Sequence, residues 1–173
     1  MSNPMREIRI EKVTLNIGVG SPGDKLDKSV KLLKSISGSK PVQTMTNERI
    51  PTWGLRPKLP IATKVTVRGK KAEELLRRLL AARENKLDES KFDNFGNVSF
   101  GIPEYIDIPD VAYDASIGVI GLEVAVTFSR PGYRIKRRFV LTRKIPKRHS
   151  VTKTEALAFM KSKFNVDFGE EEQ

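Results

Sequence analysis

Two segments of the chain alternate apolar and polar residues with the two-residue period of a half-buried β-strand. Their polar positions carry cations, hydroxyls and an amide, at Lys12, Thr14 and Asn16 in one segment and at Lys64, Thr66 and Arg68 in the other. If the two strands are neighbours, these groups form a flat, donor-rich surface that suits the phosphates, 2′-hydroxyls and base edges of RNA. Each segment alone is at least as typical of a solvated sheet face, in which threonine serves β-propensity.

The distribution of charge favours the RNA interpretation. The chain carries 32 Lys and Arg against 21 Asp and Glu, a net charge of +11, and its pI is near 9.9. Such a pI is typical of nucleic-acid-binding domains. Residues 130–149 contain nine Lys or Arg and no acid, whereas residues 102–129 contain five acids and no Lys or Arg. This segregation produces a directional field that suits a polyanion on one side of the molecule.

The basic stretch, residues 130–149, interleaves its cations with apolar side chains, at Tyr133, Ile135, Phe139, Val140 and Ile145. A purely electrostatic tail lacks such side chains, so we expect the stretch to dock partly on the domain. It then offers eight cations to the phosphates of a nucleic acid: Arg134, Lys136, Arg137, Arg138, Arg143, Lys144, Lys147 and Arg148. Two prolines and a glycine interrupt any amphipathic helix here, which argues against a membrane-surface role.

The single tryptophan, Trp53, lies in a basic loop that spans residues 49–60 and contains three prolines. Arg56 and Lys58 lie close by in the sequence, and stacking of Trp53 on RNA bases is therefore one interpretation. The other is that Trp53 folds back against the edge of the core, because tryptophan is usually mostly buried. Both interpretations stay open at the level of the sequence.

The segment GVGSPG, residues 18–23, fits the G-x-G-x-x-G fingerprint between a strand and a helix, so a nucleotide-binding enzyme is the alternative function. However, the first strand of a dinucleotide-binding fold is buried on both faces, whereas this one has a polar face. Repeated strand–helix–strand units are also missing, and the glycines suit a tight turn. The one histidine, His149, lies among cations, and the chain has no cysteine. We therefore expect no enzyme, no catalytic residue, no cofactor and no metal.

Periodicity predicts strands near residues 8–17, 41–46, 61–68, 97–102 and 122–128, and helices over about 24–37 and 70–84. A last helix opens at TKTE, residues 152–155, and has apolar residues on one side as far as Phe164. We expect Asp24 to cap the first helix, Gly38 to end it, and Thr152 with Glu155 to form a capping box before the last. Strands with one polar face predict an α+β fold: a two-layer domain with an antiparallel or mixed sheet, one side facing RNA and helices packed on the other.

The length of 173 residues suits one domain over residues 1–173, with a frayed acidic tail at residues 169–173. No apolar run approaches the length needed to span a membrane, and the N-terminus has no signal-peptide core. We therefore expect a soluble, intracellular protein without a membrane partner.

Five blocks occur in a specific order: VTLNIGVG, ISGSKPVQT, GLRPKLPIATKVTVRG, FDNFGNVSFGI and GLEVAVTF. In this the chain resembles the universal 5S rRNA-binding family of the large ribosomal subunit, the "L-five" ribosomal proteins, from about residue 6 to residue 164. Bacterial members carry a long helical arm before the first block, and almost nothing precedes it here. The basic stretch and the last helix resemble archaeal or eukaryotic members, and missing nuclear-type extensions favour the archaeal type.

The resemblance implies a structural role in the cytoplasmic ribosome. It implies that the sheet face binds 5S rRNA, with Gln43, Thr44 and Thr46 beside the six residues named first. It implies that residues 49–60 reach P-site tRNA, with Arg49, Trp53, Arg56 and Lys58 as the contacting residues. It also implies a place in the central protuberance beside 23S rRNA and other ribosomal proteins, and a bridge to a protein of the small-subunit head.

Overall fold

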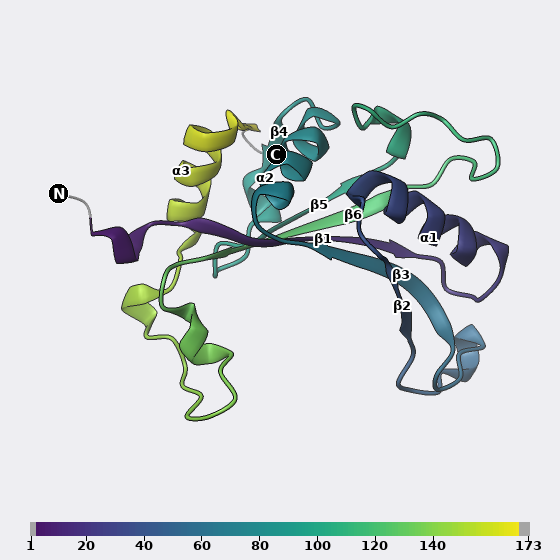
Figure 1. Ribbon diagram of the computed structural model, residues 1–173, viewed down its shortest axis with the longest axis horizontal. Coiled ribbons are helices and arrows are strands. Elements are labelled where there is room, and N and C mark those ends of the chain that lie inside the picture. The colour runs from purple at the N-terminus through teal and green to yellow at the C-terminus, as the bar shows by residue number, and fades with distance from the viewer. Residues whose placement is uncertain (1–2, 170–173) are drawn as a thin grey trace.

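The computed structural model describes residues 3–169, which form a five-stranded sheet with three helices on one side (Figure 1). The elements follow the order β1 (Arg9–Gly18), α1 (Asp24–Ser37), β2 (Val42–Met45), β3 (Pro60–Val67), α2 (Lys70–Ala81), β4 (Lys86–Asp88), β5 (Val98–Ile102), β6 (Leu122–Ser129), α3 (Lys153–Phe164) and β7 (Asp167–Gly169). The predicted α+β class and two-layer arrangement are confirmed.

The main sheet has the strand order β2-β3-β1-β6-β5, and every neighbouring pair in it is antiparallel. β1 is the central strand. Its register sets Thr14 opposite Thr66 of β3 and opposite Ala125 of β6. Residues paired in this way present their side chains on the same face of the sheet, so the register defines the composition of each face.

The core lies between the sheet and the helices. Val13 and Leu15 of β1 are fully buried there, as are Leu33 of α1 and Leu76 and Leu79 of α2. α3 covers the end of β6, where the rings of Phe128 and Phe159 meet edge to face with centroids 5.6 Å apart. Since burial of one such side chain stabilises by roughly 1.5–3 kcal/mol, this layer fixes which face of the sheet the helices cover.

A β-bulge at Glu11 explains a change of phase in the first strand. Ile10 pairs with Phe128 but Lys12 already pairs with Thr127, so Glu11 is an extra residue in β1. In a regular strand Ile10 and Val13 would face opposite sides of the sheet, because they are an odd number of residues apart. The extra residue changes the alternation, so that Ile10 lies on the helix side together with Val13, Leu15 and Ile17. The polar positions from Lys12 onward therefore all face the other way.

Several predicted boundaries need correction. Gly23, with φ 132°, is the N-cap of α1, so Asp24 lies in the first turn and is not the cap. Gly38 ends α1 in the left-handed conformation, and the Thr152–Glu155 capping box is present, as predicted. α2 ends at Ala81 and not at residue 84.

The parallel pair β4–β7 was not predicted, because its strands have only three residues each. Gly169 belongs to β7, and the rest of the predicted acidic tail lies outside the described residues.

Candidate nucleic-acid interface

The face of the sheet opposite the helices, called here the open face, carries small and polar side chains from all five strands. By strand register its members are Lys12, Thr14, Asn16, Val42, Thr44, Ala62, Lys64, Thr66, Ser99, Gly101, Glu123, Ala125 and Thr127. The two predicted polar strands are direct neighbours, with Asn16 opposite Lys64. Apart from Lys12, Lys64 and Glu123 the side chains are short, so a flat polyanion can approach the backbone of the sheet closely between them.

Exposure differs among the predicted residues of the open face. Lys64 and Arg68 are exposed, whereas Lys12, Thr14, Asn16 and Thr66 are half-buried by their neighbours. Arg68 follows the last residue of β3 and continues its alternation. Half-buried polar groups at fixed strand positions are held in place before any partner arrives, which lowers the entropy lost on binding.

Glu123 is an acid on the open face that the sequence reasoning did not include. The side-chain amide of Asn16 donates to Glu123 Oε2 at 3.1 Å. This bond orients the Asn16 amide and leaves its oxygen free to accept. Because a carboxylate repels phosphate, the arrangement suits a sugar hydroxyl or a base amino group at this point better than a phosphate.

Lys91, Ser99 and Thr127 were also missed. Lys91, which is exposed, lines a shallow hollow together with Thr14, Asn16 and Ser99. The strands that contain Ser99 and Thr127 were predicted from their alternating apolar residues. The residues between these apolar positions must face the opposite side of the sheet, and this alternation could have identified both Ser99 and Thr127. Lys91 lies in a short 3-10 turn before β5, and no sequence pattern links it to the open face.

Gln43, Thr44 and Thr46, the three residues expected to bind RNA from β2 and just beyond it, take different positions in the structure. Thr44 pairs with Ala62 and lies on the open face, whereas Gln43 pairs with the buried Thr63 and therefore lies on the helix side. The Thr46 hydroxyl donates to the carbonyl of Arg56, so it fastens the base of the following loop. A strand cannot place consecutive residues on one face, and the structure does not bring Gln43 to the open face.

The loop between β2 and β3, called here the finger (residues 46–59), is held by its own hydrogen bonds. At its base Lys58 N donates to Thr46 O at 2.8 Å and Thr46 N to Leu59 O at 2.9 Å, and Ile50 and Leu55 form a bridge nearer the tip. Trp53 is 73% exposed, which excludes the interpretation that it seals the core edge. Arg49, Arg56 and Lys58 are exposed as well.

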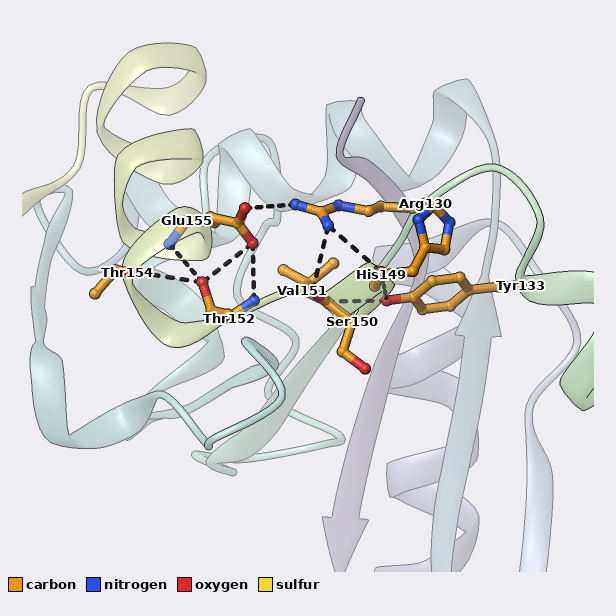
Figure 2. Close-up of polar contacts among 8 residues, drawn as sticks. All are labelled: Arg130, Tyr133, His149, Ser150, Val151, Thr152, Thr154 and Glu155. Atoms are coloured by element: carbon orange, nitrogen blue, oxygen red, sulfur yellow. Dashed lines mark hydrogen bonds and ion pairs between the residues drawn. The ribbon is translucent and has the colours of Figure 1, made fainter. Parts of the chain in front are cut away.

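Both ends of the basic stretch are fastened to the start of α3 (Figure 2). Arg130, only 5% exposed, donates to Glu155 Oε1 at 2.6 Å and to the carbonyls of His149 and Ser150 at 3.4 and 3.3 Å. The Tyr133 hydroxyl accepts from Val151 N at 2.9 Å and donates to His149 O at 3.2 Å. The stretch is thus a folded part of the domain, as its apolar residues predicted.

The tip of the basic stretch departs from the prediction. Phe139, Val140 and Leu141 are 101%, 66% and 72% exposed, so Phe139 and Val140 do not dock on the domain. The chain reverses here through bonds from Arg138 Nε to Leu141 O and from the Thr142 hydroxyl to Arg138 O, at 2.8 and 2.7 Å. These bonds hold the turn closed and leave its side chains projecting outward.

Among the described residues, Arg137 is the one predicted rRNA-binding cation that forms an ion pair, with Glu11 Oε1 at 2.6 Å. The other seven cations of that set, Arg134, Lys136, Arg138, Arg143, Lys144, Lys147 and Arg148, are exposed. The charge of the stretch is therefore largely available to a polyanion.

The finger and the basic stretch project from opposite ends of the sheet, both on the side away from the helices (Figure 1). In this view the finger is the blue loop beside β2 and β3, and the basic stretch is the yellow-green segment that follows β6. The open face lies between them.

The nucleotide-binding alternative does not agree with the structure. In the GVGSPG turn the amides of Val19 and Gly20 donate to Ile61 O at 2.9 and 2.8 Å, so they are not free to hold a phosphate. The sheet is also antiparallel, unlike the parallel sheet of a dinucleotide-binding fold.

Within residues 3–169 no cluster of three or more His, Cys, Asp or Glu could hold a metal ion. No helix in this range is long and apolar enough to cross a membrane.

Comparison with known proteins identifies the family. The model described as ribosomal protein L5 matches residues 3–56, and the model for the C-terminus of the same ribosomal family matches residues 60–159. The chain is 51% identical to the large ribosomal subunit protein uL5 of Sulfurisphaera tokodaii over 95% of this chain and 93% of that protein. It is 50% identical to the protein of the same name from Nanoarchaeum equitans, over 96% and 98% of the two chains.

The chain therefore belongs to the ribosomal protein L5 family, and its similarity to archaeal members confirms the resemblance inferred from the five blocks. As a member of this family it is a non-enzymatic component of the ribosome in the cytoplasm. The two family models meet at the finger, yet the strands of both halves join in one sheet around β1.

The ion pair between Arg130 and Glu155, which holds the basic stretch on the domain, should stabilise the fold less at acidic pH. Burial by itself would raise the pKa of Glu155, but hydrogen bonds from Thr152 and the ion pair with Arg130 together lower this pKa below its ordinary value. The ionised carboxylate therefore stabilises the fold above the unfolded-state pKa of about 4.3, and this contribution is lost as the pH falls through the folded-state pKa.

We predict that Glu155→Gln lowers the free energy of unfolding by about 1–3 kcal/mol at pH 7, because it weakens a charge-assisted bond to a buried guanidinium. We also predict that the variant loses less stability than the wild type between pH 5 and pH 3, a range that follows from the ordinary pKa of about 4.3. Urea unfolding across this range measures both effects. Equal pH profiles for the two proteins would show that Glu155 does not carry this contribution.

Proposed function

We propose that the protein is a structural constituent of the large ribosomal subunit that binds 5S rRNA through its open face and helps to attach it in the central protuberance. The observation that carries the proposal is the difference between the two faces of the sheet. All three helices cover one face, and the face left open combines Lys12, Lys64 and Lys91 with hydroxyls and an amide. Residues 1–173 act as one domain in this proposal.

The chemistry of the open face matches RNA more closely than DNA or an acidic protein. Lysines position a sugar–phosphate backbone, while Thr14, Thr66 and Asn16 can exchange hydrogen bonds with 2′-hydroxyls and base edges. The acid Glu123 beside Asn16 adds an acceptor for a donor group of the RNA. Such a mixture of donors and acceptors at fixed positions suits a shaped RNA surface.

The two projections extend this surface in the proposal. The finger, with Arg49, Trp53, Arg56 and Lys58 exposed, reaches P-site tRNA, and the basic stretch contacts 23S rRNA or 5S rRNA through its seven exposed and unpaired cations. In this proposal the protein also contributes to the bridge with the small-subunit head, through a protein of that head, and the only support for this part is the resemblance to the family.

The first prediction of the proposal concerns the open face. Asn16→Ala is expected to weaken 5S rRNA binding by about 1–3 kcal/mol, because RNA groups paired with the amide would be left unsatisfied. Lys64→Ala is expected to weaken binding as well, through loss of a phosphate contact. Filter binding with 5S rRNA measures both affinities.

The matched control for the open-face variants is Lys34→Ala, which removes an exposed lysine from α1 in the helix layer. This variant should bind 5S rRNA nearly as the wild type does. Unchanged affinity in both Asn16→Ala and Lys64→Ala, with the thermal midpoint preserved, would contradict the proposal.

The second prediction separates free from paired arginines in the basic stretch. Arg134→Ala should reduce the slope of log affinity against log salt by roughly one unit in magnitude, the effect of one lost phosphate contact. Arg137→Ala should reduce the slope less, because Arg137 already pairs with Glu11. A salt titration of rRNA binding compares the two variants.

A Glu11→Gln variant provides the check, because it removes the ion-pair partner of Arg137. In this background, Arg137→Ala should reduce the salt slope by as much as Arg134→Ala does. A salt slope that stays constant in all of these variants would show that the basic stretch does not contact phosphates.

The third prediction concerns the finger. Replacement of residues 47–58 by a tight glycine-containing turn should preserve the fold and 5S rRNA binding, because the finger contributes no buried side chain to the core. Ribosomes that carry the shortened protein should retain P-site tRNA less well. Toeprinting or tRNA release from purified ribosomes measures this retention.

Trp53→Ala provides a milder variant of the same test and should leave the thermal midpoint unchanged, since the ring is largely exposed. Loss of 5S rRNA binding in the shortened protein, with its fold intact, would place the finger in the 5S surface and not in a tRNA contact.

A further inference from the structure

A groove with an apolar floor lies between the basic stretch and the end of β6. It has a volume of about 550 Å³, and its lining includes Phe95, Lys136, Thr142, Arg143, Lys144 and Ile145. This volume is within the range of small-ligand sites, which are mostly apolar with a few polar groups. Three of its residues, Lys136, Arg143 and Lys144, are among the cations proposed above to contact rRNA, but that proposal gives no role to the apolar floor or to Phe95.

The Tyr133 side chain and the backbone turn that carries Phe95 are both held by hydrogen bonds of the fold. Tyr133 is held by its two hydrogen bonds to residues 149 and 151. Phe95 lies in a turn in which the Asp93 carboxylate accepts from the amides of residues 95 and 97 at 2.9 and 2.7 Å. The groove is therefore shaped by contacts within the chain itself.

Gly96 brings the Phe95 turn against the opposite wall of the groove. It has φ 77°, and a Cβ at this position would lie 2.8 Å from the Val151 side chain and 3.1 Å from Thr152 O. Only glycine allows this close approach. Phe95 itself is 70% exposed, so its ring is open to solvent at the groove.

The charges of the groove have one sign. Its lining includes the exposed cations Lys136, Arg143 and Lys144 and no acid. Thr127, also in the lining, pairs with Lys12 of the open face, so the groove continues the surface proposed to bind rRNA. An apolar peptide seated here would leave these cations without partners, whereas a nucleotide offers both a flat apolar base and a phosphate.

We propose that the groove holds one unpaired nucleotide of ribosomal RNA, with its base against Phe95 and its flanking phosphates on the three cations. This inference rests on the proposed rRNA-binding function and adds a specific subsite to it. Bases turned out of a helix are commonly read in this way, by stacking on aromatic rings beside cations.

The test is an NMR titration of the isotope-labelled full chain with three probes: a short single-stranded oligoadenylate, an abasic ribose–phosphate oligomer of equal length, and ATP. We expect the oligoadenylate to shift the ring signals of Phe95 and the methyl signals of Thr142 and Ile145. The abasic oligomer should shift signals of the cations alone and bind more weakly, and ATP should bind more weakly than the oligoadenylate.

The decisive variant is Phe95→Ala, which should weaken oligoadenylate binding about tenfold, the effect of one lost stacking contact, and leave binding of the abasic oligomer unchanged. Phe139→Ala is the matched control, because Phe139 is fully exposed in the same basic region but does not line the groove. It should bind oligoadenylate as the wild type does.

Three results would overturn the inference: equal binding of oligoadenylate and the abasic oligomer, binding of ATP as tight as that of the oligoadenylate, or groove signals that do not respond to the oligoadenylate. If the wild-type chain binds 5S rRNA and the open-face variants weaken it, any of these results contradicts the groove alone. Failure of 5S rRNA binding in the wild type would instead contradict the proposed function.

Discussion

The alternation of side chains along β1 is the constraint on which the rest of the structure depends. β1 is hydrogen-bonded to β3 on one side and to β6 on the other, so its two faces set the faces of its neighbours through the register. Val13, Leu15 and Ile17 require apolar cover, which the helices supply, and the same period sends the polar positions to the opposite side. A slip of one residue would exchange the two faces, and the bulge at Glu11 keeps the apolar residues before and after it in one layer.

The charges show why net charge alone overstates what a polyanion can reach. Arg130 is buried and neutralised by Glu155, and Arg137 is paired with Glu11. Both ion pairs link the basic stretch to the body of the domain, so these arginines stabilise the position of the stretch. The remaining cations are thereby presented on a folded scaffold, which reduces the entropy cost of binding in comparison with a disordered tail.

The sequence predicted what local periodicity determines. The long strands, all three helices and the polar face shared by β1 and β3 followed from alternation and capping, because burial of one face imposes a pattern on neighbouring residues. β4 and β7 were missed because three residues cannot show a period, and Gln43 was assigned to the open face although its neighbour Thr44 already occupied that phase.

What could not be predicted from the sequence depends on hydrogen bonds and contacts that leave no periodic pattern. The outward position of Phe139 follows from a turn closed by Arg138 and Thr142, and the exposure of Trp53 follows from hydrogen bonds between the two ends of the finger. Lys91 reaches the open face through the path of the chain before β5, and Glu123 meets Asn16 across the β1–β6 pairing. Neither contact leaves a signal in the local sequence.

The central claim is that RNA covers the open face and not the helix layer. Amine-reactive footprinting of the protein, alone and bound to 5S rRNA, tests it most directly by reading the reactivity of individual lysines. The account predicts that Lys64 and Lys91 become protected in the complex, while Lys34 of α1 and Lys71 of α2, both exposed in the free chain, stay reactive. Protection of Lys34 and Lys71 with Lys64 unchanged would contradict the account.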